Sequence, residues 1–192
     1  MYILNAKRII FFHNPKTAGR STIVGLGFPE DNGLKLSHLT PDVARKCIFQ
    51  ESWKSYYSFS FVRNPWDRMV SLYEYHRSLE YGIFQRMNSS HALARSYTFD
   101  EWILINHKRL KRSNWFGVPQ SDWTRGVSKV FRFEDYVSAT QELLNILGEP
   151  RSIEHLNKSV RRGYAEYYLR EETVDIVRSI DIDTISTFDY RF

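Results

Sequence analysis

The chain has 192 residues, a single cysteine and a formal net charge of +5 at pH 7. That length favours one compact domain, and a 42% hydrophobic content is enough for a single core. The lone Cys47 excludes an internal disulfide and a cysteine-based zinc cluster. The positive charge suits an anionic ligand, but it is dispersed and accompanied by no repeat or zinc-finger spacing, so we expect no nucleic-acid partner.

The first residues of the chain and its hydropathy bear on where in the cell the protein is expected. Residues 1–8 have neither the apolar region nor the cleavage site of a secretory signal. No apolar run approaches the ~18 residues that a membrane span requires. We therefore expect a cytoplasmic protein with no membrane partner, and leave its oligomeric state open.

The first informative stretch is residues 9–22, where a bulky apolar run stops at a Pro-Lys-Thr turn. The run Ile9 to Phe12 does not alternate with polar residues, which predicts a strand buried on both faces of a parallel sheet. The segment after the turn predicts a helix, whose first N–H groups and dipole favour an anion. Side chains there add one positive charge and three hydroxyl groups: Lys16, Thr17, Ser21 and Thr22.

Later segments continue the alternation of strands and helices. We predict strands over residues 9–12, 57–62 and 127–131, and helices over about residues 41–47, 65–79, 99–110, 134–147 and 170–180. Residues 81–97 read as a long exposed loop, residues 151–168 as a basic irregular segment, and the aromatic tail 188–192 as docked on the core.

This order predicts an α/β fold with one domain over residues 1–192, a P-loop-like three-layer sandwich around a central parallel sheet. Ligands of such sheets bind beyond the carboxyl ends of the strands. We expect residues 14–22 and 63–71 to emerge together at that edge.

The second motif is Val62-Arg63-Asn64-Pro65-Trp66, followed by Ser71. Arg63 at a strand end can present its planar fork to two phosphate oxygens, and Ser71 adds a neutral donor. The first motif is not a Walker loop, because Lys16 precedes Gly19, the only glycine of the turn. In this order, the two motifs resemble those of sulfotransferases that use 3′-phosphoadenosine 5′-phosphosulfate (PAPS).

The version of the second motif looks like that of the carbohydrate-sulfating branch, related to the Golgi chondroitin and heparan enzymes. The similarity continues through residues 120–123, 130–136, 155–159 and 188–192 and so covers nearly the whole chain. It implies transfer of a sulfuryl group from PAPS to an acceptor hydroxyl, on a saccharide in this branch.

The resemblance also implies roles for individual residues. Arg63 and Ser71 would bind the 3′-phosphate of PAPS. The basic segment over residues 151–168 would cover the adenine and the 3′-phosphate. The residues expected to bind PAPS are Lys16, Thr17, Gly19, Arg20, Ser21, Thr22, Arg63, Ser71, Lys158, Ser159 and Arg161, with Arg162 as a further member of that segment.

Sulfuryl transfer needs positive charge on the leaving phosphate oxygens and a base for the acceptor hydroxyl. Lys16 supplies the charge. We assign His38 as the base, because imidazole titrates near neutrality and related carbohydrate sulfotransferases place a catalytic histidine between the two phosphate motifs. Glu74 is a rival base, and His13 is expected to be structural. The histidines lack ligand spacing, so no metal site is predicted.

Two positions depart from the family loop, which commonly reads Pro-Lys-Thr-Gly-Gly-Thr-Ser. Ala18 replaces a glycine, which is tolerated if its backbone angles are ordinary. Arg20 replaces a threonine, where it either adds charge at the sulfate or obstructs it. Because of Arg20, a nucleotide-binding module without turnover remains an alternative. The other alternative is an atypical P-loop nucleotide kinase, which the absence of a Gly-x-x-x-x-Gly-Lys pattern disfavours. Trp102, Trp115 and Trp123 are candidates for stacking on a sugar ring of the acceptor.

Overall fold

A computed structural model describes residues 1–29, 38–49, 54–78, 90–109, 115–149 and 161–192. The chain forms two compact units, each made from two separate stretches. Unit 1 comprises residues 1–63 and 120–159, and unit 2 comprises residues 64–119 and 160–192. The count of a single domain stays a prediction.

Unit 1 contains a four-stranded sheet in the order β1-β2-β3-β4. Its strands are β1 (Tyr2–Leu4), β2 (Ile9–Phe12), β3 (Tyr57–Val62) and β4 (Lys129–Arg132). Strands β2, β3 and β4 are parallel, as predicted, whereas β1 is antiparallel to β2 and was not predicted. Three residues are too few to show a hydrophobic period, so β1 could not be recognised from the sequence.

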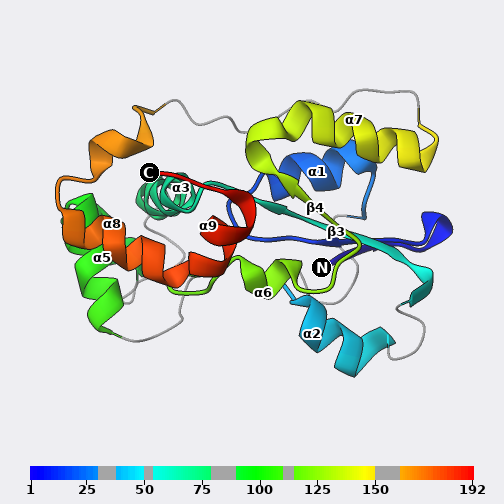
Figure 1. The fold of residues 1–192 in the computed structure, drawn as a ribbon, viewed down its shortest axis with the longest axis horizontal. Coiled ribbons are helices and arrows are strands. Elements are labelled where there is room, and N and C mark those ends of the chain that lie inside the picture. The colour runs from blue at the N-terminus through cyan, green and yellow to red at the C-terminus, as the bar shows by residue number, and fades with distance from the viewer. Residues whose placement is uncertain (30–37, 50–53, 79–89, 110–114, 150–160) are drawn as a thin grey trace. The chain divides into compact units, whose positions relative to one another are not determined.

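Helices cover both faces of this sheet (Figure 1). Helices α1 (Gly19–Leu26) and α7 (Tyr136–Leu147) lie on one face, and α2 (Pro41–Ala44) and α6 (Ser121–Thr124) lie on the other. All four residues of β2 are buried, since Ile9 and Phe11 belong to the core cluster that includes α1 and α7, while Ile10 and Phe12 cluster with Ala44 of α2. Burial on both faces explains the apolar run without alternation.

The parallel register brings two loops to one edge of the sheet. Phe12 at the end of β2 pairs with Ser60 of β3, and Val62 at the end of β3 pairs with Arg132 of β4. The segment after β2 and the first residue after β3, Arg63, therefore leave the sheet at the same edge, as the sequence predicted for this part of the site.

Unit 2 is built from helices. They are α3 (Pro65–Ser78), α4 (Ser90–Ser96), α5 (Phe99–Lys108), α8 (Glu171–Ile180) and α9 (Ile182–Phe188), with a short 3-10 helix over Tyr164–Tyr167. Asn64 caps α3 as predicted, because its Oδ1 accepts the N–H groups of Trp66 and Asp67 at 3.1 and 3.2 Å.

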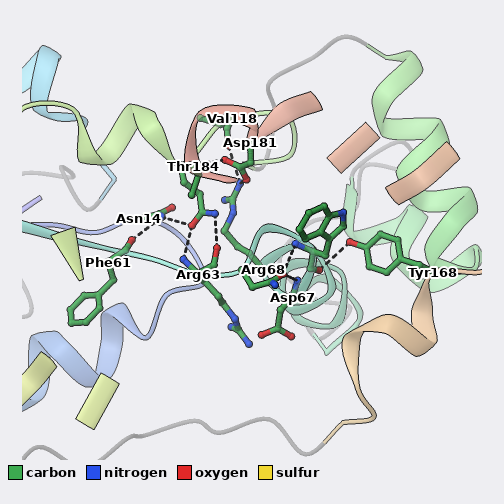
Figure 2. Close-up of polar contacts among 12 residues, drawn as sticks. Asn14, Phe61, Arg63, Asp67, Arg68, Val118, Tyr168, Asp181 and Thr184 are labelled. Atoms are coloured by element: carbon green, nitrogen blue, oxygen red, sulfur yellow. Dashed lines mark hydrogen bonds and ion pairs between the residues drawn. The ribbon is translucent and has the colours of Figure 1, made fainter. Parts of the chain in front are cut away.

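Buried aromatic side chains hold unit 2 together. The indole N–H of Trp66 donates to the Val174 carbonyl at 3.1 Å. The Tyr168 hydroxyl donates to the Trp66 carbonyl at 3.0 Å (Figure 2). The Phe192 ring centroid lies 5.6 Å from that of Trp66 and 5.2 Å from that of Tyr168, and Tyr190 is buried. The predicted docking of the aromatic tail is confirmed for Tyr190, whereas Phe192 contacts these rings with 49% of its surface exposed.

Some predicted boundaries were wrong. Residues 90–96 form α4 within the segment predicted to be a loop, whereas residues 81–89 lie outside the described residues. Helix α9 was missed because it has only 7 residues, which is too short for a clear hydrophobic period. Helix α7 begins at Tyr136, since Phe133–Asp135 form a 3-10 turn. Among the helices of the described residues, none has the length and apolarity to cross a membrane.

Candidate functional site

The turn after β2 has an unusual backbone. Lys16 and Ala18 have φ angles of 70° and 60°, in the left-handed region that disfavours side chains by about 1–2 kcal/mol per residue. The condition under which Ala18 was expected to be tolerated, ordinary backbone angles, is therefore not met, and alanine occupies a conformation that suits the glycine of the family loop. Such strain persists only where surrounding contacts fix it, and it is often found at ligand sites.

Buried hydrogen bonds fix this turn. Asn14 is fully buried, and its Nδ2 donates to the Phe61 carbonyl at 2.9 Å and to Gln120 Oε1 at 3.0 Å (Figure 2). The Thr17 hydroxyl, also fully buried, donates to the Asn14 carbonyl at 2.8 Å. Asn14 therefore ties the turn to the end of β3.

Arg63, the first residue after β3, contacts the Lys16 turn. Its Nη1 donates to the Lys16 carbonyl at 3.0 Å, and its guanidinium carbon lies 4.2 Å from the centre of the Phe133 ring. The residue is only 8% exposed. Gln120 holds the Arg63 backbone at both groups, because Oε1 accepts its N–H at 3.0 Å and Nε2 donates to its carbonyl at 2.8 Å. The structure thus brings together two of the predicted phosphate residues, Lys16 and Arg63.

The start of α1 presents the remaining residues of the first motif. Arg20 is exposed, whereas Ser21 and Thr22 are buried. The Thr22 hydroxyl donates to the Ala18 carbonyl at 3.1 Å and lies 3.3 Å from the hydroxyl of Tyr136 on α7. Thr22 therefore contributes to the attachment of α1 to α7.

Two histidines lie together beside this turn. The ring centroids of His13 and His38 are 4.5 Å apart, and His38 Nδ1 lies 3.1 Å from the His13 carbonyl oxygen. A carbonyl can only accept, so Nδ1 carries the proton and Nε2 has the lone pair. Burial lowers the pKa of His38 to about 4, which keeps this tautomer neutral at pH 7.

Further contacts fix both histidines. The indole N–H of Trp123, on α6, donates to the His38 carbonyl at 3.1 Å. The His13 ring stacks on Phe11 with centroids 5.7 Å apart, and burial lowers its pKa well below 6.5. A Cβ at Gly19 would lie 1.8 Å from His13 Nε2, so the close approach of this ring requires glycine at residue 19. His13 is structural, as expected, and it supports both Gly19 and His38.

One comparison with known proteins gives a match, and that match includes the second motif. The model of the sulfotransferase family matches residues 34–183, well over half of the chain. The chain therefore belongs to the sulfotransferase family. No curated protein and no solved structure matches it. The match covers His38, Arg63 and Gln120 and begins after the turn that carries Lys16.

Membership establishes the general activity: this sulfotransferase is a transferase of sulfuryl groups, and its acceptor bears a hydroxyl. Within the described residues, no cluster of three or more histidine, cysteine, aspartate or glutamate side chains could hold a metal ion.

The other predicted site residues of the sulfotransferase belong to unit 2 or to segments outside the described residues. Ser71 is half-buried on α3. Arg161 forms an ion pair with Asp67, in the first turn of the same helix. Glu74, the rival base, pairs with Arg77 at 3.2 Å. Lys158 and Ser159 lie outside the described residues.

Sequence reasoning missed three residues that hold the site together: Asn14, Gln120 and Trp123. Asn14 directly precedes the Pro-Lys-Thr turn, and an asparagine there is a signal for a side chain that bonds to backbone. The sequence marks Gln120 and Trp123 as members of a block similar to the sulfotransferase family, and Trp123 also as a candidate surface for sugars. Trp123 and Trp102 are 2% and 0% exposed, which excludes both from an open sugar-stacking surface.

Proposed function

We propose that the protein transfers a sulfuryl group from PAPS to a hydroxyl of a saccharide, with His38 as the general base. The observation that supports this most directly is the hydrogen bond from Arg63 Nη1 to the Lys16 carbonyl, since it joins the two motifs expected to bind phosphate. The saccharide acceptor and a cytoplasmic location rest on the sequence alone.

The residues present suit PAPS as a ligand. Lys16, Arg63 and the N-terminus of α1 all offer positive charge or N–H donors, and all belong to unit 1. Backbone N–H groups at a helix start bind anions, and an arginine fork matches two phosphate oxygens. PAPS would supply the sulfuryl group itself.

The residues of this chain would stabilise the negative charge on the leaving group and accept the proton of the acceptor hydroxyl. The acceptor oxygen forms a bond to sulfur as the bond from sulfur to the phosphate oxygen breaks, and adenosine 3′,5′-bisphosphate (PAP) leaves. Lys16 offsets the negative charge that grows on the leaving oxygen. His38 Nε2 takes the hydroxyl proton, in the tautomer fixed by the His13 carbonyl. A bound anion near His38 raises its pKa from about 4 toward neutrality, which improves it as a base.

Calorimetric titration with PAP and with ADP tests the donor site, because the two nucleotides differ in the position of the second phosphate. We expect a clear preference for PAP and a loss of affinity of about 10- to 100-fold in Arg63→Ala, as for hydrogen bonds to a charged group. Arg8→Ala is the matched control, because Arg8 is an exposed arginine at the opposite end of β2. Equal or tighter binding of ADP with magnesium would favour the kinase alternative.

Turnover with His38→Asn tests the base. Asparagine can keep an N–H donor near the His13 carbonyl but has no equivalent of Nε2. We expect turnover to fall by about 100-fold or more while PAP affinity is kept, as on removal of a general base. His107→Ala, an exposed histidine on α5, is the control. Unchanged turnover in His38→Asn would remove His38 from this role, and absence of turnover in the wild type would favour the binding module.

A further inference from the structure

Helix α6 carries two side chains that reach different parts of the candidate site. Gln120, the N-cap residue of α6, is fully buried and binds Asn14 of the turn and both backbone groups of Arg63. Trp123, three residues later, binds the His38 carbonyl. One short helix therefore contacts the phosphate residues and the base from a single position in unit 1.

The Gln120 amide continues the pattern of a β-ladder beyond the end of β3. Its oxygen accepts from the Arg63 N–H and its nitrogen donates to the Arg63 carbonyl, at 3.0 and 2.8 Å, as a neighbouring strand would. The same oxygen also accepts from Asn14 at 3.0 Å. Because Asn14 accepts the Thr17 hydroxyl and Arg63 holds the Lys16 carbonyl, Gln120 links both sides of the phosphate site.

We propose that α6 is the positioning element of this sulfotransferase, with Gln120 setting the geometry of Lys16 and Arg63 and Trp123 setting that of His38. This inference rests on the proposed function. Neither residue is catalytic, since each acts through another. The two contacts serve different steps, so their loss should affect different kinetic constants.

Gln120→Met removes both polar atoms at nearly constant length. We expect PAP affinity to fall by about tenfold, as on loss of buried hydrogen bonds, with kcat at saturating PAPS changed less than threefold.

Trp123→Phe removes the indole N–H and keeps an aromatic ring in the core. We expect the reverse: PAP affinity within about twofold of wild type and a kcat lowered by about tenfold, because His38 loses an anchor. Thr124→Val is the control on the same helix, because its hydroxyl donates within α6 to Ser121.

Gln120→Glu gives a second readout that a general loss of stability would not produce. At pH 8 its carboxylate faces the Arg63 carbonyl and cannot donate, whereas the protonated acid formed at lower pH can. Burial raises the pKa of such a carboxyl, so a larger share of it is protonated at pH 6 than at pH 8. The PAP affinity of Gln120→Glu, taken relative to wild type at each pH, should therefore recover by about fivefold or more between pH 8 and pH 6.

The outcomes separate this inference from the function on which it rests. Wild-type protein that does not prefer PAP over ADP would overturn the proposed function, and the role of α6 with it. A second outcome is a wild type that prefers PAP while each variant lowers PAP affinity and kcat in the same proportion, or changes neither. That result would overturn only the role of α6. Gln120→Glu decides the matter if Gln120→Met does not fold: an affinity ratio independent of pH would contradict the positioning role.

Discussion

Gly19 shows at the scale of one residue how the turn depends on close packing. Its Cα approaches the His13 ring so closely that a Cβ would lie 1.8 Å from Nε2 and 2.0 Å from Cδ2. The ring cannot simply move away, because it stacks on Phe11 and lies 4.5 Å from the His38 ring. A methyl group at residue 19 would therefore displace His13 and disturb the histidine that we assign as the base.

We predict that Gly19→Ala lowers the free energy of unfolding by about 1–3 kcal/mol, the usual cost of overpacking, and also weakens PAP binding. Urea unfolding and calorimetry measure the two effects. The double variant Gly19→Ala/His13→Ala removes the ring that the methyl group would meet, so it should recover part of the loss. Additive effects of the two substitutions would contradict a direct clash.

At the scale of elements, the sequence predicted those strands and helices whose cause is local. The apolar run of β2 and the aromatic and β-branched run of β3 mark buried strands, and Asn64 and Gly148 mark the start of α3 and the end of α7. The elements that were missed, β1, α4, α6 and α9, are short, with 3, 7, 4 and 7 residues.

The same distinction holds for the site. The Lys16 turn and Arg63 could be recognised because they lie in motifs of fixed spacing. Gln120 could not be assigned a role, since its partners Asn14 and Arg63 are 106 and 57 residues away in sequence. The left-handed angle of Ala18 was also invisible, because alanine is ordinarily a sign of regular structure.

The end of α7 gives a prediction at this scale. Gly148 has φ 69°, its N–H donates to the Asn145 carbonyl at 3.1 Å, and the N–H of Glu149 donates to the Leu144 carbonyl at 2.9 Å. No heavy atom of the described residues would meet a Cβ at residue 148, so the cost of a side chain is conformational alone. Thermal unfolding should show Gly148→Ala destabilised by about 1–2 kcal/mol, and Gly148→Asn by less, because asparagine tolerates the left-handed region. Equal costs for both variants would argue against this explanation.

At the scale of the whole molecule, partly buried histidines with lowered pKa values are expected to make the fold sensitive to acid. Burial lowers the pKa of His13 and His38 in unit 1 and of His91 in unit 2. In the unfolded chain these rings bind protons near pH 6.5, whereas in the folded protein they stay neutral to lower pH. The unfolded state therefore binds more protons as the pH falls, and acid stabilises it relative to the folded state.

We predict that the histidines stabilise the fold fully above about pH 6.5 and that this stability is lost as the pH falls toward about 4, the pKa of His38. Urea unfolding at pH 7.5, 6.5, 5.5 and 5.0 measures the free energy of unfolding in a window where most carboxyl groups are still ionised. His38→Asn should flatten the decline, because one of the proton-binding rings is gone from the unfolded chain. His107→Ala is the matched control variant, because His107 is exposed on α5. The free energy of unfolding could instead stay constant from pH 7.5 to 5.0. These rings would then bind protons equally in the folded and unfolded states. That result would contradict the neutral tautomer on which the assignment of His38 depends.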